Sequence, residues 1–307
     1  MGHLEGKNIA VTGAGNGIGR AIAIACAAEG ANVVVADYGV SIDGSDPSSE
    51  VADGVVDEIK AAGGEAVAVA GDVSVMEVGQ SVVDAALDFW GSIDGVVCVA
   101  GIVRERMLFN MSEDEFDEVV GVHLKGHFTL YKAASAAMRK QETGGSLIGF
   151  TSGAFVASTA QANYSAAKGG IVSLTRSAAF SLRKYGINAN CIAPAAMTRM
   201  SENVPFEIEA GSPEAIAPLA IYLLSDSARH VTAQIYTCTG RRIAVWNQPA
   251  EVRHMWAEDG ETFTVDEIAT KLPVAIGEEE MPMFADLDRR MNEMAAAKDS
   301  GAGGAGS

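Results

Sequence analysis

Short apolar runs alternate along most of this chain with longer stretches whose apolar residues recur at helical spacing. The short runs lack the strict alternation of a half-exposed strand, so we expect strands that are buried on both faces. We predict strands at 8–12, 32–36, 65–70, 94–100, 146–150, 187–193 and 234–239. Helices are predicted at 17–29, 50–62, 75–90, 112–140, 160–184 and 213–225. This order predicts a three-layer α/β fold, in which a doubly wound parallel sheet of about seven strands lies between helices, as in a Rossmann fold.

Two segments interrupt the alternation. Residues 38–50 are rich in Gly, Ser, Asp and Pro, which predicts an irregular surface loop. The pattern stops after about residue 241, although the capping-box spacing of Thr264 and Glu267 predicts a short helix there. A further helix is predicted at 281–298. We therefore divide the chain into a main domain at 1–240, an extension at 241–299 that packs on the body or on a subunit neighbour, and a disordered tail at 300–307.

Charge and cysteine spacing exclude several classes of protein. The 307 residues carry a formal net charge of -18 without a cluster of Lys and Arg, so neither nucleic acid nor anionic membrane is an expected partner. The start lacks the features of a secretory signal and no apolar run reaches membrane-spanning length, which predicts a cytoplasmic protein. Cys26, Cys98, Cys191 and Cys238 lie far apart without metal-ligand spacing, so no metal site is expected.

A glycine-rich turn, "TGAGNGIGR" at 12–20, directly follows the first predicted strand and opens the first helix. Glycines at such a junction permit a tight turn and a close approach of backbone amides to a pyrophosphate, while the helix N-terminus supplies partial positive charge. Its spacing differs from GxGxxG, because Ile18 stands where the third glycine would fall. We predict a phosphate-binding segment formed by Gly13, Asn16, Gly17, Ile18 and Gly19.

Acidic residues end the next two strands. Asp37 follows the glycines by about twenty residues, where a carboxylate accepts hydrogen bonds from both ribose hydroxyls and repels a 2′-phosphate. This position favours NAD over NADP as the cofactor. Asp72 and Val73 follow the third strand, and we expect them to flank the adenine at the same sheet edge.

Tyr164 and Lys168 are four residues apart in a predicted helix and therefore share one face. A phenol becomes a base at pH 7 only if its pKa falls by about three units, which corresponds to roughly 4 kcal/mol. One ammonium about 4 Å away, at an effective dielectric constant near 20, supplies about 4 kcal/mol. The pair therefore predicts a general base that removes a hydroxyl proton while hydride leaves the carbon.

Taken together, the glycine turn, Asp37, an upstream serine and the Tyr-Lys pair resemble the short-chain dehydrogenase/reductase family over residues 5–240. The resemblance implies that 1–240 is a dinucleotide-binding catalytic domain, that Tyr164 is the base, that Lys168 also holds the nicotinamide ribose, and that Ser152 positions the substrate. Ser152 lies twelve residues before Tyr164, where the family commonly shows thirteen. Either Ser152 still reaches the substrate or Thr151 takes its place, and we predict Ser152.

The chain departs from the family pattern at three places. "CVAG" (98–101) replaces Asn-Asn-Ala-Gly, which leaves Ala100 and Gly101 as the expected cofactor contacts there. His123 replaces the helix asparagine that completes a proton relay in many members, and it is either a relay or a structural residue. "APAAMTRM" (193–200) lacks the usual Pro-Gly, although Thr198 is still able to bind the nicotinamide carboxamide.

These variants resemble one subgroup. It comprises the (3R)-hydroxyacyl-CoA dehydrogenase unit of peroxisomal multifunctional enzyme type 2 and the free-standing actinobacterial enzymes of sterol side-chain degradation. The resemblance implies oxidation of a secondary alcohol on a hydroxyacyl-CoA, with Arg104, Arg106 and Lys125 as a local patch for its phosphates. The family usually forms tetramers, so a homotetramer is implied as well.

Two other functions are compatible with the same residues. A dehydrogenase of a free steroid, terpene or other alicyclic alcohol would use the same motifs on a substrate without coenzyme A. A catalytically silent dinucleotide-binding protein would explain the variant positions, but it would not need Tyr164 and Lys168 at helical spacing.

Overall fold

The computed structural model describes residues 2–39, 48–195, 211–251, 253–257, 262–277, 289 and 292–293. It divides into two compact units, residues 1–246 and 247–307. The strands are β1 (Asn8–Thr12), β2 (Asn32–Asp37), β3 (Ala66–Ala70), β4 (Gly95–Cys98), β5 (Gly145–Phe150), β6 (Ile187–Pro194), β7 (Ile235–Cys238) and β8 (Ile243–Val245). The helices are α1 (Gly17–Ala28), α2 (Glu50–Ala61), α3 (Met76–Trp90), α4 (Glu113–Val120), α5 (Gly126–Gln141), α6 (Ala162–Leu182), α7 (Ala217–Leu224) and α8 (Val265–Ala275).

The strands form one sheet with the order β3-β2-β1-β4-β5-β6-β7-β8. All pairs from β3 to β7 are parallel, while β8 pairs antiparallel with β7. Because the chain order reverses between β1 and β4, a crevice is expected outside the carboxyl ends of these two strands. The predicted doubly wound fold is therefore confirmed, with β8 as one strand more than the seven expected.

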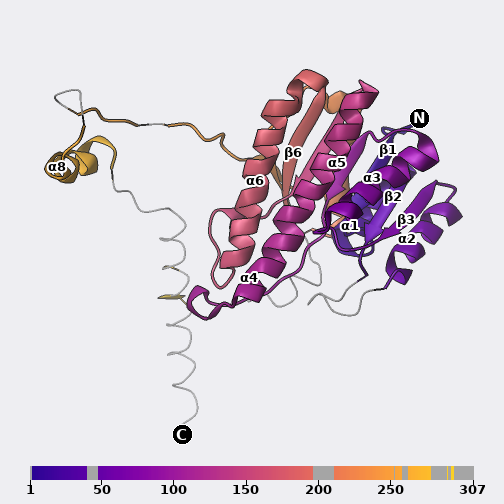
Figure 1. Cartoon of the computed structure of the whole chain (residues 1–307), viewed down its shortest axis with the longest axis horizontal. Helices are drawn as coiled ribbons and strands as arrows, with labels where there is room; N and C mark the ends of the chain where they lie inside the picture. The colour runs from indigo at the N-terminus through magenta and orange to yellow at the C-terminus, as the bar shows by residue number, and fades with distance from the viewer. Residues whose placement is uncertain are drawn as a thin grey trace, which may run out of the picture. The chain divides into compact units, whose positions relative to one another are not determined.

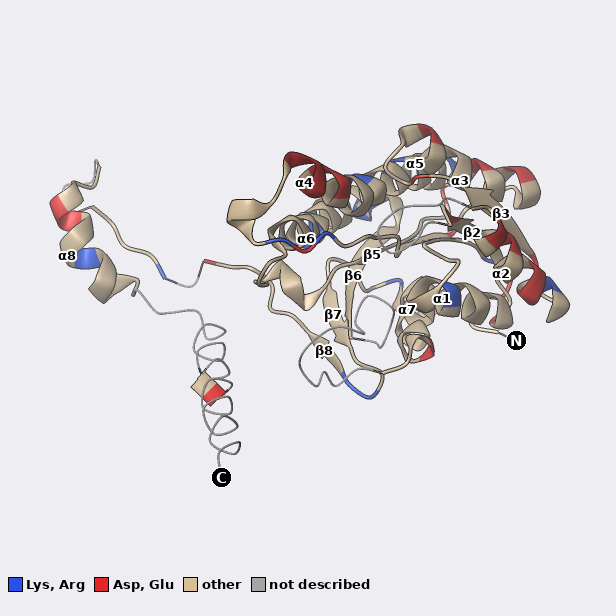
Figure 2. Ribbon diagram, turned by 90° about the horizontal axis from the view of Figure 1, so that it is seen from below, with Lys and Arg blue, Asp and Glu red and all other residues tan. Residues whose placement is uncertain are grey.

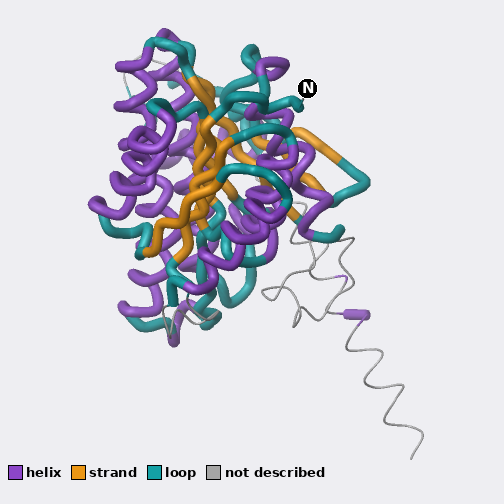
Figure 3. The backbone as a smooth tube through the Cα atoms, turned by 90° about the vertical axis from the view of Figure 1, so that its right-hand side faces the viewer, coloured by secondary structure: helices purple, strands orange, loops and turns teal. Residues whose placement is uncertain are grey.

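Helices cover both faces of the sheet, which Figure 3 shows nearly edge-on. Side chains that alternate along each strand enter one of two cores, and in β1 Ile9 and Val11 face the core formed with α1, α2 and α7. Ala10 enters the opposite core, formed with α3, α5 and α6 (Figure 1). Burial of both faces explains why the strands are continuously apolar.

The predicted helix at 112–140 is interrupted. Its first part, α4, begins at a capping box in which the Ser112 side chain accepts from the backbone N–H of Glu115. A π-helical turn at Gly121–Lys125 then separates α4 from α5. π-turns insert one residue into a helix and often occur at functional sites. This turn changes the direction of His123, and the apolar periodicity of the sequence does not reveal it.

In the second unit, the predicted capping box is present. Thr264 Oγ1 accepts from the backbone N–H of Glu267 at 3.2 Å, and Glu267 Oε2 accepts from the backbone N–H of Thr264 at 2.9 Å. Helix α8 follows directly, as predicted. Of the helix predicted at 281–298 only residues 289, 292 and 293 are described, and these three are helical, while residues 40–47 of the loop at 38–50 lie outside the described residues.

Two helical glycines allow the packing of α3 against α5 to be tested. A Cβ atom added to Gly79 in α3 would lie 2.6 Å from Thr129 Cβ in α5, whereas one added to Gly54 in α2 meets nothing within 4 Å. We expect Gly79→Ala to lower the free energy of unfolding by about 1–3 kcal/mol through overpacking. Gly54→Ala should raise it by about 0.5–1 kcal/mol through helix propensity. Urea denaturation measures both, and equal effects would contradict the tight contact.

Candidate active site

The N-terminus of α1 is open to an anion. Its N-cap residue, Asn16, makes no side-chain hydrogen bond to the helix, and the first turn has no acidic residue. Gly13 and Gly17 have φ values of +64° and +53°, which L side chains rarely adopt. The first-turn amides are therefore available to a phosphate group, as the sequence predicts for this segment.

The glycine turn also touches the end of β4. A Cβ atom on Gly13 would lie 2.7 Å from the Ala100 backbone nitrogen, and one on Gly19 would lie 2.1 Å from the Gly13 carbonyl oxygen. Thr12 Oγ1 accepts from the backbone N–H of Val99 at 3.2 Å and of Ala100 at 3.4 Å. Close backbone packing thus joins the phosphate end to the segment that leads to the chemical end.

Asp37 ends β2 at the same edge. Its Oδ2 accepts from the Gly15 backbone N–H at 2.8 Å, and its Oδ1 accepts from the Gly39 backbone N–H at 2.7 Å. A carboxylate has about four acceptor positions, so two remain for ribose hydroxyls. The open helix end and this carboxylate together fit a nicotinamide dinucleotide.

Asp72 and Val73 follow β3, whose last residue, Ala70, pairs with Asp37. Asp72 Oδ1 accepts from the Ser74 backbone N–H at 2.8 Å, which fixes the turn. Val73 is buried, and its carbonyl accepts from the Thr129 hydroxyl at 2.7 Å. Both residues lie at the carboxyl edge near Asp37, and their contact with the adenine stays a prediction.

His123 supports the turn that follows β4. Its Nε2 lies 2.8 Å from the Ile102 carbonyl oxygen and 3.2 Å from the Ile102 backbone nitrogen. A Cβ atom on Gly101 would lie 2.1 Å from His123 Cε1, so the ring requires glycine at that position. Its Nδ1 is buried and has no hydrogen-bond partner in the described part of the chain. One ring nitrogen is therefore structural, and the other is left for a relay.

Tyr164 lies between His123 and Lys168. The rings of His123 and Tyr164 meet edge to face with centroids 5.1 Å apart, and Lys168 Nζ lies 5.2 Å from the Tyr164 ring centroid. Asn163 fixes the start of this helix, because its Nδ2 donates to the carbonyls of Arg104 at 3.0 Å and Glu115 at 2.8 Å. Its Oδ1 accepts from the Tyr164 backbone N–H at 2.8 Å.

The pKa values of the pair differ from the sequence-based expectation. Burial raises the pKa of Tyr164 above its ordinary value, while the hydrogen bond with the Ser152 side chain opposes this. Burial lowers the pKa of Lys168 to about 7. Burial therefore opposes the effect expected of the Lys168 ammonium, and a lowered pKa of Tyr164 beside a bound nicotinamide stays a prediction.

The two hydroxyl candidates occupy different places. The Ser152 side chain lies beside the Tyr164 phenol, where it lowers the phenol pKa, and its Oγ accepts from the Ala154 backbone N–H at 3.2 Å. Thr151 is buried, and its Oγ1 donates to the Lys168 carbonyl oxygen at 2.9 Å. Ser152 therefore faces the reacting phenol, whereas Thr151 fastens the end of β5 to α6.

His127 is a residue that the sequence analysis missed. It is fully buried, its Nδ1 donates to the His123 carbonyl at 2.6 Å, and its Nε2 accepts from the Phe150 backbone N–H at 3.1 Å. The Phe150 carbonyl in turn accepts from Lys168 Nζ at 2.6 Å. The only sequence signal was a second histidine four residues after His123. His127 thus links the π-helical turn to the strand end that positions Lys168.

Exchange of His127 tests this link. We expect His127→Phe to leave the buried Phe150 backbone N–H unpaired and to lower kcat about 10- to 100-fold by displacing Lys168. His127→Gln retains one donor and one acceptor and should recover most of the turnover at an unchanged KM. Steady-state kinetics of both variants are the measurement, and equal loss in both would contradict a role through hydrogen bonding.

Acid unfolding gives a second readout for His127. Burial lowers its pKa from 6.5 to about 3, so between these values the unfolded chain binds a proton that the folded chain does not bind. Stability should therefore fall as the pH falls below 6.5, by up to about 1.4 kcal/mol per pH unit for this residue. His127→Gln should make this dependence shallower, while His230→Gln on the surface should leave it unchanged.

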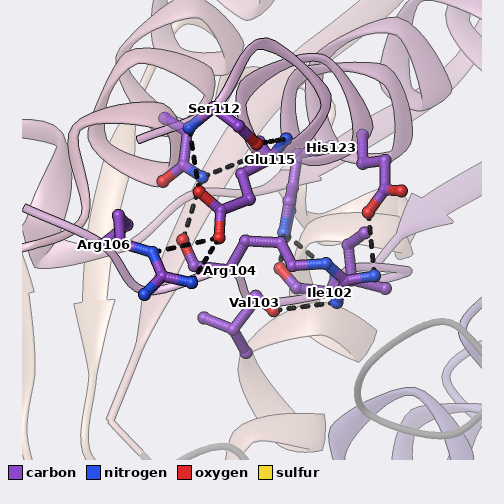
Figure 4. A network of polar contacts seen from close by, with 9 residues as sticks. Ile102, Val103, Arg104, Arg106, Ser112, Glu115 and His123 are labelled. Carbon is purple, nitrogen blue, oxygen red and sulfur yellow. Dashed lines mark hydrogen bonds and ion pairs between the residues drawn. The ribbon is translucent and has the colours of Figure 1, made fainter. Parts of the chain in front are cut away.

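Two predicted phosphate ligands are already paired. Arg104 Nη2 lies 2.8 Å from Glu118 Oε2, and Arg106 donates to Glu115 Oε1 through Nε at 3.1 Å and Nη2 at 2.8 Å (Figure 4). The predicted patch of Arg104, Arg106 and Lys125 is therefore wrong for both arginines. The ion pairs instead hold the segment after β4 against α4, which carries the dense acidic surface in Figure 2.

The described residues hold neither a metal-binding cluster nor a membrane-spanning helix. They contain no group of three or more His, Cys, Asp and Glu residues that could hold a metal ion. No helix among them is long and apolar enough to cross a membrane. Thr198, the predicted carboxamide ligand, lies outside the described residues.

The crevice, the open helix end and the Ser-Tyr-Lys arrangement define a dinucleotide-binding oxidoreductase. A family model described as Enoyl-(Acyl carrier protein) reductase matches residues 13–240. Hydroxyacyl-CoA dehydrogenase ChsB1 of Mycobacterium tuberculosis is 40% identical over 289 residues, which cover 88% of this chain and 88% of that protein. A solved short chain dehydrogenase from Mycobacterium avium is 42% identical with a TM-score of 0.82, covering 91% of this chain and 98% of that one.

Peroxisomal multifunctional enzyme type 2 of Mus musculus is 43% identical over 226 residues, or 73% of this chain. The match spans only 30% of the mouse protein, which is much longer. The chain belongs to the short-chain dehydrogenase/reductase family. It is an oxidoreductase that acts on CH–OH groups.

Proposed function

We propose that the protein oxidises the secondary alcohol of a hydroxyacyl-CoA to a ketone with NAD. The observation that carries this proposal is the buried group of Tyr164, Lys168 and His123, with Lys168 Nζ 5.2 Å from the Tyr164 ring centroid and Ser152 beside the phenol, in a chain 40% identical to a protein named hydroxyacyl-CoA dehydrogenase. The names of the relatives support a hydroxyacyl-CoA as the substrate, and the geometry of the side chains supports oxidation of its alcohol.

Each side chain has a distinct task in the proposed reaction. Ser152 Oγ orients the substrate hydroxyl, and Tyr164 Oη takes its proton. A nicotinamide dinucleotide held by the glycine turn and Asp37 would supply the hydride acceptor and, in its oxidised form, a positive charge that favours the ionised phenol. Lys168 Nζ, whose pKa is about 7, takes up and releases a proton near neutral pH and holds the ribose. His123 Nδ1, buried without a partner among the described residues, is the proposed outer member of the relay.

NAD is proposed over NADP because of Asp37. Its carboxylate lies beside the glycine turn, bound to the Gly15 backbone N–H, where a 2′-phosphate would be repelled. The nearby cation Arg20 in α1 is ion-paired with Glu58 in α2. Asp37 is an anion and Arg20 is already paired with Glu58, so neither Asp37 nor Arg20 offers free positive charge to the 2′-phosphate of NADP.

Three narrower proposals concern the substrate, the cellular location and the oligomeric state. That the acyl group is a sterol side chain, and that the protein is cytoplasmic, are both proposed from the sequence alone. A homotetramer is supported by exposed aromatic side chains on the two longest helices of the main unit, since Phe128 in α5 is 45% exposed and Phe180 in α6 is 92% exposed. Packing of the extension on the body or on a neighbour stays a prediction.

A substrate panel tests the proposed function. We expect turnover of hydroxyacyl-CoA with NAD, weak turnover with NADP, and little turnover of matched free alcohols. Tyr164→Phe should lower kcat about 10²- to 10⁴-fold and leave NAD binding intact, because it removes only the proton acceptor. Absence of wild-type activity on every thioester would contradict the substrate class, and unchanged turnover in Tyr164→Phe would contradict the mechanism.

Separate variants assign the hydroxyl. Ser152→Ala should lower kcat, because this side chain faces Tyr164, and should lower the free energy of unfolding by no more than about 1 kcal/mol through loss of the bond from the Ala154 N–H. Thr151→Val should lower the free energy of unfolding by about 1–3 kcal/mol, because the Lys168 carbonyl loses its donor. Kinetics and urea denaturation of both variants separate the two roles, and the opposite pattern would assign the substrate oxygen to Thr151.

A further inference from the structure

A hollow of about 460 Å³ reaches Gly153, the residue that directly follows Ser152. It lies where β6 and β7 end, beside the additional strand β8, and its lining includes Gly153, Pro194, Thr237, Arg242, Ala244 and Trp246. A ligand in this hollow is therefore continuous with the proposed substrate site.

The wall of the hollow is held firmly in place. Trp246 packs edge to face on Phe155 with ring centroids 4.8 Å apart, and its Nε1 donates to Thr237 Oγ1 at 2.9 Å. Its backbone N–H donates to the Ile235 carbonyl at 2.9 Å. Phe155 ends the short 3₁₀ turn η3 (Gly153–Phe155) that begins directly after Ser152. The indole thus forms a fixed apolar surface next to the serine loop.

Arg242 is the charged member of this lining. It lies in the turn that joins β7 to β8, which is coloured blue in Figure 2, where its backbone carbonyl accepts from the Thr239 N–H at 3.0 Å. Its guanidinium has no ion pair or hydrogen bond with the described residues. Besides the Thr237 hydroxyl, which accepts from Trp246 Nε1, the guanidinium is the main polar recognition group of an otherwise apolar hollow and the charged one.

We propose that this hollow is a substrate subsite in which Arg242 binds an anionic oxygen group of the substrate and Trp246 forms the apolar wall. The inference rests on the proposed function, which places the reacting alcohol beside Ser152. Phosphate and carboxylate both match the planar donor fork of an arginine. In a hydroxyacyl-CoA the group is a phosphate of the coenzyme, and in a substrate with a carboxylated acyl chain it is the distal carboxylate.

Three substrates with one acyl skeleton distinguish these two sources. They are the hydroxyacyl-CoA, the same hydroxyacyl group on pantetheine, which lacks phosphates, and a pantetheine thioester whose acyl chain ends in a carboxylate. Arg242→Gln should raise KM about tenfold for the charged substrate that uses the site, leave kcat unchanged, and have no effect on the uncharged pantetheine thioester. Arg241→Gln, the neighbouring residue on the same turn, is the matched control and should behave as wild type.

The pattern of losses decides the source of the anion. If KM in Arg242→Gln rises only for the CoA thioester, Arg242 binds a phosphate of the coenzyme. If KM rises only for the carboxylated pantetheine thioester, Arg242 binds the distal carboxylate. Equal KM values for wild type and Arg242→Gln on all three substrates, or an equal rise on all three, would overturn the proposal.

A binding measurement separates this proposal from the proposed function. Free coenzyme A and a medium-chain dicarboxylate are titrated against the protein while tryptophan fluorescence is recorded. We expect one of them to change the emission of Trp246, the change to disappear in Trp246→Phe, and the affinity to fall about tenfold in Arg242→Gln. Binding without turnover of any thioester would reject the proposed function and retain the subsite. A signal that Arg242→Gln does not alter would reject the subsite.

Discussion

The backbone of Phe150 anchors both sides of the active site. Its carbonyl accepts from Lys168 Nζ at 2.6 Å, and its N–H donates to His127 Nε2 at 3.1 Å. Lys168 is buried, and an amine in such a place requires a hydrogen-bond acceptor. The last residue of β5 therefore holds the lysine and, through His127, the π-helical turn. Ser152 follows Phe150 by two residues, so the anchored strand end also fixes the position of Ser152.

A second contact joins the chemical end to the phosphate end. Gly101 leaves room for the His123 ring, and Gly13 leaves room for the backbone at Ala100. Both contacts involve the segment after β4, and Asn163 ties the continuation of that segment, at Arg104, to the start of α6. Hydride transfer needs a cofactor and a base in fixed relation, and these backbone contacts connect their sites directly.

The sequence predicted the features that depend on local pattern. Periodicity and spacing predict the buried strands, the glycine turn, Asp37 at a strand end and the shared face of Tyr164 and Lys168. In the structure the strands form one sheet, Asp37 binds the glycine turn, and Lys168 lies beside Tyr164. It could not predict the π-helical turn, because one inserted residue barely changes the apolar pattern. It could not predict the role of His127 either, because its partners are backbone atoms on distant elements.

Charge and burial were harder to predict from the sequence. The sequence suggests that Arg104 and Arg106 are free cations, whereas in the fold they form ion pairs with Glu118 and Glu115 of α4. An ammonium at an effective dielectric constant near 20 lowers the pKa of a nearby phenol, whereas burial raises the pKa of Tyr164 and lowers that of Lys168. Both differences have one physical cause, since the charge of each group depends on what the fold packs around it.

Deuterium tracing tests the central claim most directly. A hydroxyacyl-CoA that carries deuterium on the alcohol carbon is incubated with the protein and NAD, and the products are examined by NMR. The account predicts one deuterium on the reduced nicotinamide for each ketone formed, together with a slower reaction than with the protium substrate. Binding of both molecules without deuterium transfer would show that the chain is a dinucleotide-binding protein and not a working dehydrogenase.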